Sequence, residues 1–99
     1  MVSFQYVEFY DVPRTIALRY RGKLLLLQSA FDQARDEYPT DYTVYLLPES
    51  VATQLASGSW KFLEELALEA LGQVPVKSVR FDSSNRKELD PSILDQFVR

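Results

Sequence analysis

Residues 14–29 of the chain read RTIALRYRGKLLLLQS, and this stretch predicts a β-hairpin. Apolar and polar side chains alternate over residues 14–20, which is the pattern of a strand with one buried face and one exposed face. Arg21 and Gly22 fit a two-residue turn, because glycine accepts a positive φ without steric cost. Residues 23–29 then return as the partner strand.

The returning strand contains four consecutive leucines, Leu24 to Leu27, which break the alternation. A strand that is apolar on both sides is typical of a strand covered on both faces. We therefore expect helices to cover one face and a loop or a partner to cover the other. Because a chain of 99 residues has limited cover of its own, this strand also gives a reason for a homodimer.

Strands are also predicted on both sides of the hairpin. Residues 4–10 and 41–47 are rich in aromatic and β-branched side chains, which favour strands. Residues 11–14, DVPR, predict a turn before the hairpin in which Pro13 sets φ, and Pro48 ends the later strand.

The second half of the chain predicts three helices and one further strand. The helices are expected over residues 49–57, 59–71 and 91–98, and the second has apolar residues at helical spacing, with Gly72 just beyond its end. The third would begin at Asp90 as N-cap with proline in its first turn. Residues 74–81 are β-branched and short, which favours a strand.

The predicted element order is β-β-β-β-α-α-β-α. It indicates an α+β fold in one globular domain, residues 1–99, with a mostly antiparallel meander sheet of about five strands. Two to three helices would lie on one face of that sheet.

Composition argues against an enzyme. The chain has neither histidine nor cysteine, so it lacks the commonest general base, the strongest common nucleophile and two of the usual zinc ligands. We expect no catalytic, cofactor or metal site. With no apolar run long enough to cross a bilayer and no signal sequence, we also expect a cytoplasmic protein without membrane contact.

The segment FDQARDEYPTDY, residues 31–42, is the first candidate site. It combines carboxylates, which steer and select a basic partner, with tyrosines, which give contact area at low entropic cost. The candidate partner-binding residues are Asp32, Asp36, Glu37, Tyr38, Asp41 and Tyr42. The alternative without a binding function is a solvated crossover between two strands, whose aromatic residues pack its ends onto the core.

Two other functions stay open. The hairpin residues Arg14, Arg19, Arg21 and Lys23 form a local basic group that predicts RNA binding, although the net charge of −3 makes nucleic acid an unlikely partner. Carboxylates such as Asp36, Glu37 and Asp41 are also the groups that an ion binder or a glycosidase-like enzyme would use.

Overall fold

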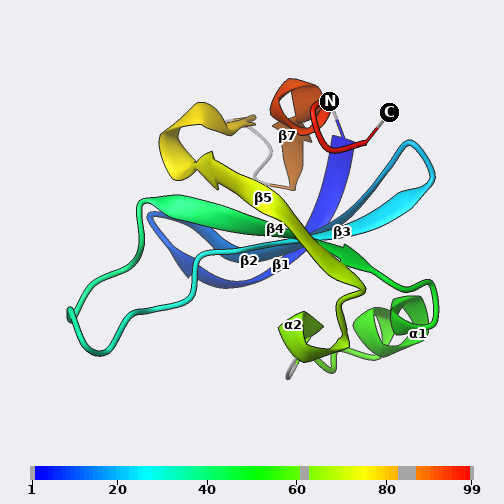
Figure 1. Cartoon of the computed structure of the whole chain (residues 1–99), viewed down its shortest axis with the longest axis horizontal. Helices are drawn as coiled ribbons and strands as arrows, with labels where there is room; N and C mark the ends of the chain where they lie inside the picture. Colours follow the sequence, from blue (N-terminus) through cyan, green and yellow to red (C-terminus); the bar gives the residue numbers. More distant parts are fainter. Residues whose placement is uncertain (1, 61–62, 83–86, 99) are drawn as a thin grey trace.

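The structure is a computed structural model that describes residues 2–60, 63–82 and 87–98 (Figure 1). In these residues, seven antiparallel strands form one sheet that curls into a half-barrel. Along the sheet the strand order is β5-β4-β3-β2-β1-β7-β6. The strands are β1 (Val2–Tyr10), β2 (Val12–Tyr20), β3 (Lys23–Gln28), β4 (Asp41–Leu47), β5 (Glu69–Pro75), β6 (Arg80–Phe81) and β7 (Glu88–Asp90).

Helical structure is limited to short pieces. The described residues contain two α-helices, α1 (Val51–Ala56) and α2 (Leu63–Leu66), and two 3-10 turns, η1 (Val76–Ser78) and η2 (Pro91–Leu94). Both α-helices lie on one side of the sheet, and η2 lies on the other (Figure 1).

The predicted β2–β3 hairpin is confirmed. Tyr20 pairs with Lys23 across the turn, and Arg21 and Gly22 both have positive φ, 51° and 79°. A two-residue turn of this kind matches the twist of the strands that it joins. The turn predicted over residues 11–14 is too long, because the chain reverses at Asp11 alone and Pro13 already pairs with Phe9 inside the sheet.

The prediction that both faces of β3 are covered is confirmed. Leu24 to Leu27 are all buried, but they belong to two different clusters. Leu25 and Leu27 point into the half-barrel, where they pack in one cluster with Ile16. Leu24 and Leu26 belong to a second cluster, which includes side chains of α1 and α2.

The inner face is covered by the chain's own carboxyl-terminal region. Val79, Leu89, Leu94 and Val98 are buried in the same cluster as the inward-facing leucines of β3. A second copy is therefore not needed to cover this strand, and the sequence-based reason for a homodimer disappears.

The predicted α+β fold, with about five strands and two to three helices on one face, is wrong. The main error lies at residues 59–71. Their apolar side chains have helical spacing, but the later part of this segment pairs as a strand. Among the described residues of this segment the helix spans Leu63–Leu66, and from Glu69 the backbone pairs with β4. Residues 61–62, which belong to the same predicted helix, lie outside the described residues.

Gly72 was predicted as a helix cap and instead lies inside β5. A Cβ atom at this position would come within 2.7 Å of the Phe97 ring. The close approach of the carboxyl-terminal turn to the sheet therefore depends on the missing side chain.

Two other predictions in the second half are corrected. The strand expected over residues 74–81 is interrupted by η1, and the helix expected over residues 91–98 is a single 3-10 turn. The cap is confirmed, since the Asp90 side chain accepts a hydrogen bond from the Ser92 N–H at 3.0 Å. Strand β7 was not predicted at all, because three residues are too few for a period to be visible.

We expect Leu25→Ala and Leu26→Ala each to lower the free energy of unfolding by about 2 to 5 kcal/mol, because each removes a fully buried side chain from a different face of β3. The matched control is Leu68→Ala at an exposed position, with an expected change below about 0.5 kcal/mol. Urea denaturation of the three variants measures the difference. A loss as small as the control's for either β3 variant would contradict burial on that face.

Candidate functional site

Three connections meet at one end of the half-barrel. They are the β1–β2 turn, the loop of residues 29–40 and η1, all at the left of Figure 1. The loop is tied to η1 by the Val76 N–H, which donates to the Thr40 carbonyl at 2.8 Å. It is tied to β2 by the Ser29 N–H, which donates to the Arg14 carbonyl at 2.8 Å.

The loop itself contains a hydrogen-bonded reversal. Asp32 and Glu37 exchange two backbone hydrogen bonds of 2.8 and 3.2 Å, and Asp36 has a φ of 54° within the turn. The Asp32 carboxylate also accepts the N–H groups of Ala34 and Arg35. Asp32 therefore has an internal role in holding the turn.

Three aromatic rings stand at the base of this loop, and we call Tyr10, Phe31 and Tyr38 the aromatic cluster. Tyr38 stacks on Tyr10 at a centroid distance of 5.3 Å and meets Phe31 edge-on at 5.1 Å. Tyr10 is 60% exposed and Phe31 is 44% exposed. Large apolar side chains gathered on a surface in this way indicate an interaction site.

Arg14 lies beneath the aromatic cluster with only 9% of its surface exposed. Its guanidinium carbon sits 4.4 Å from the centre of the Tyr38 ring. Its Nε donates to the Tyr10 carbonyl at 3.0 Å, and Nη1 donates to the Ser29 hydroxyl at 3.3 Å. Arg14 has no carboxylate partner among the described residues.

Two hollows adjoin at Arg14 and Tyr38, which line both. The smaller, of about 580 Å³, also has Tyr10, Phe31, Asp36 and Glu37 in its wall. The larger, of about 780 Å³, lies where the half-barrel opens, and we call it the mouth groove. Its remaining lining residues are Asp11, Val12, Pro39, Thr40, Asp41, Pro75, Val76, Lys77 and Val79.

The predicted partner-binding residues are only partly brought together. Asp36, Glu37 and Tyr38 line the smaller hollow, and Asp41 lines the mouth groove. Tyr42 must be removed from the candidate surface, because its ring is fully buried and its hydroxyl donates to the Pro13 carbonyl at 2.6 Å. Burial raises the pKa of the Tyr42 hydroxyl well above its ordinary value.

The predicted basic hairpin does not present one free positive patch. Arg14 is buried at the opposite end of β2 from the turn, while Arg21 is 3.3 Å from the Asp95 carboxylate. Arg19 donates two hydrogen bonds to Glu49, at 2.5 and 2.9 Å. These hydrogen bonds lower the pKa of the Glu49 carboxyl and raise that of Arg19. Lys23 is exposed beside them.

The carboxylates Asp36, Glu37 and Asp41 were also considered as ion ligands. The part of the chain that the structure describes contains no group of three or more acidic residues arranged to hold a metal. Asp41 and the pair Asp36 and Glu37 border different hollows.

Sequence reasoning missed Tyr10, Asp11 and Lys77, which reach the site from other segments. Tyr10 and Asp11 lie at the β1–β2 reversal. A prediction of the turn at Asp11 would have indicated that they lie next to the loop. Lys77 lies in η1, the unpredicted break in a predicted strand, so no local signal identifies it.

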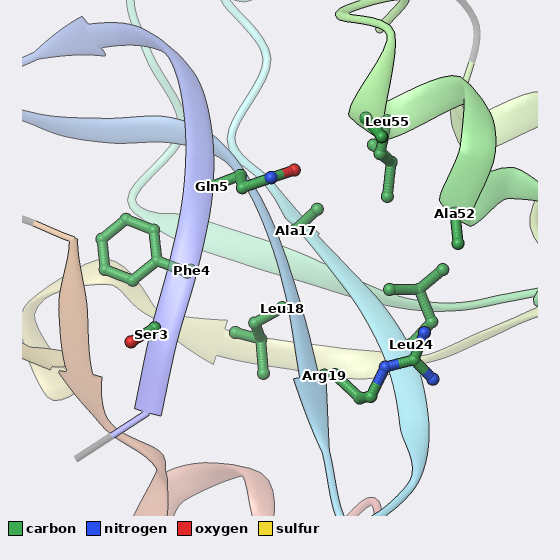
Figure 2. Close-up of a pocket in the computed structure, with 10 residues that line it drawn as sticks. Ser3, Phe4, Gln5, Ala17, Leu18, Arg19, Leu24, Ala52 and Leu55 are labelled. Atoms are coloured by element: carbon green, nitrogen blue, oxygen red, sulfur yellow. The ribbon is translucent and has the colours of Figure 1, made fainter.

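A further hollow of about 300 Å³ lies on the outer face of the sheet beside α1. Figure 2 shows the Gln5 side chain pointing from β1 toward α1, above Ala17. The small side chains of Ala17 and Ala52 leave this space open. Its cation, Arg19, is already paired with Glu49.

We expect the Arg19–Glu49 pair to stabilise the fold in a pH-dependent way. Because the pKa of folded Glu49 is lowered, its contribution is present above the ordinary glutamate pKa of about 4.3 and is lost as pH falls through the folded value. Carboxyl NMR titration should show the pKa of Glu49 returning toward ordinary in Arg19→Gln. The control Arg21→Gln should leave it low, and an unchanged titration in Arg19→Gln would contradict the pairing.

No helix among the described residues is long and apolar enough to cross a bilayer. Comparison of the chain with protein-family profiles, curated proteins and solved structures found no match. The chemistry of this end of the half-barrel is therefore the basis on which a function is inferred.

Proposed function

We propose that the protein is a non-enzymatic interaction module that binds a basic segment of another protein through its acidic, tyrosine-containing loop. The contact surface consists of the aromatic cluster and the carboxylates beside it, Asp11, Asp36, Glu37 and Asp41. The observation that carries the proposal is the exposure of Tyr10 and Phe31 beside carboxylates that are free of ion pairs with described residues.

The aromatic cluster supplies a preformed contact. Tyr10 and Phe31 are held by ring contacts with Tyr38, and the adjoining loop is closed by the backbone hydrogen bonds between Asp32 and Glu37. A partner therefore meets rigid rings and loses little conformational entropy in ordering them. Tyrosine is enriched at protein interfaces for this reason.

The carboxylates steer a cationic partner toward this surface. Asp36 and Glu37 are exposed in the wall of the smaller hollow, and Asp11 and Asp41 border the mouth groove. Carboxylates on one side of a binding surface speed the approach of a cationic partner and disfavour an anionic one.

The alternatives receive less support from the same residues. A phosphate backbone needs several free cations on one surface, but Arg14 is buried and Arg19 and Arg21 are paired with carboxylates. A carboxylate enzyme or ion binder built on Asp36, Glu37 and Asp41 needs these acids to face one cleft, but Asp41 borders a different hollow from Asp36 and Glu37. The cytoplasmic location stays a prediction from the sequence.

The test is a quantitative pull-down from native lysate with three baits: wild type, a loop variant and a control. The loop variant carries Asp36→Asn, Glu37→Gln and Asp41→Asn and keeps Asp32, whose carboxylate holds the turn. We expect it to retain a wild-type partner at least about tenfold less well, because steering and charge complementarity are removed.

The control bait carries Glu64→Gln, Glu65→Gln and Glu69→Gln, which remove the same number of carboxylates from the α2 region, all of them exposed. It should retain the partner as wild type does. Equal retention by all three folded baits, or equal loss from both variants, would contradict binding at the loop.

A further inference from the structure

The positive charge of Arg14 is not neutralised by the described residues. Only 9% of the Arg14 surface is exposed, yet the hydrogen bonds of its guanidinium go only to neutral oxygens, the Tyr10 carbonyl and the Ser29 hydroxyl. The Ser29 hydroxyl in turn donates to the Pro39 carbonyl at 3.2 Å, so it is oriented to accept from Arg14. A buried cation without an anion is costly, and a ligand that brings one removes that cost.

One nitrogen of the Arg14 guanidinium, Nη2, has no hydrogen-bond partner among the described residues. Every buried side-chain nitrogen and oxygen among the described residues has a hydrogen-bond partner, whereas Nη2 of Arg14 donates to none of them. Nη2 therefore keeps accessible surface, and the spaces that Arg14 lines are the mouth groove and the smaller hollow beside it. Nη1 and Nη2 together form a fork that suits a carboxylate.

The rest of the mouth groove sets the character of the ligand. Val12, Pro39, Pro75, Val76 and Val79 give it an apolar wall. Its charged residues are Arg14 and Lys77 on the positive side and Asp11 and Asp41 on the negative side. A ligand that fits has an apolar body, one anionic group and a cationic group close by.

We propose that the mouth groove binds the carboxyl-terminal end of the partner, with the terminal carboxylate on Arg14 and an apolar last side chain against Val76 and Val79. A basic residue upstream in the same segment lies near Asp11 and Asp41. This inference rests on the proposed function, because it assigns which part of the basic partner segment is recognised.

A carboxylate suits this groove better than a phosphate. The two aspartates bordering the groove repel a doubly charged group more strongly than a singly charged one. A peptide end carries a single negative charge, and the residues before it supply the matching cation and the apolar side chain.

The experiment uses two synthetic peptides, acetyl-Lys-Lys-Ser-Val-Leu as the free acid and the same sequence as the amide. Each is titrated into the isotope-labelled full chain at millimolar concentration, and amide resonances of Val12, Thr40 and Val76 report occupation of the groove. We expect the free acid to bind at least tenfold more tightly than the amide. N-acetylleucine as free acid should bind weakly at the same residues, since it lacks the cationic group.

Variants separate the two charges. Arg14→Gln should abolish the preference for the acid, and Arg14→Lys, which keeps the charge without the fork, should reduce it. Asp11→Asn with Asp41→Asn should weaken both peptides and keep the acid-to-amide ratio. Arg21→Gln, a paired and exposed arginine, is the matched control and should change neither peptide.

The outcomes distinguish this inference from the proposed function. Equal affinity for the acid and the amide in the wild type, or shifts confined to Tyr10 and Phe31, overturns recognition of a carboxyl terminus and leaves loop binding intact. If neither peptide shifts these resonances, the inference is also overturned. The proposed function is tested separately by the pull-down with the loop variant. Because the acid-to-amide comparison uses wild type, it holds even if Arg14→Gln does not fold.

Discussion

The fold depends on one constraint, which is that β3 must be buried on both faces. Four consecutive leucines cannot alternate between core and water, and burying one leucine contributes about 1.5 to 3 kcal/mol. The chain meets this requirement twice, with α1 and α2 over Leu24 and Leu26 and with the carboxyl-terminal region over Leu25 and Leu27. The sheet then curls around the inner cluster, which contains Leu25 and Leu27, and the half-barrel has an open end.

The open end is where the candidate site lies, and its residues are held by the same curling. Arg14 is in β2, Asp41 begins β4, and Lys77 belongs to η1 after β5, so a sheet that is flat would keep them apart. The Tyr42 hydroxyl joins β4 to Pro13 of β2 beneath the site, and Val76 joins η1 to the loop. A rigid frame of this kind supports recognition without large rearrangement on binding.

At this end of the half-barrel the negative charges lie at the surface and the positive charge of Arg14 lies deeper. The carboxylates stand at the rim, where water solvates them, whereas the guanidinium of Arg14 lies beneath aromatic rings. The Tyr38 ring and neutral oxygens lower the cost of burying that charge but do not neutralise it. The arrangement favours a ligand with both charges over one with either alone, and thus gives specificity as well as attraction.

The sequence by itself determined the local structure: the Arg21-Gly22 turn, the burial of the four leucines, the Asp90 cap and the acidic character of the loop. Each is encoded within a few neighbouring residues, through φ preference, side-chain period or hydrogen bonding to the adjacent backbone. Tertiary structure decided the rest. Residues 69–71 have helical spacing, but the unpaired edge of β4 offers them backbone hydrogen bonds and a core position for Val74. These long-range contacts outweigh the helix propensity of Glu69, Ala70 and Leu71. The same kind of contact brings Arg14, Tyr38 and Lys77 together and buries Tyr42, because which face of a strand turns inward follows from how the sheet curls around its partners.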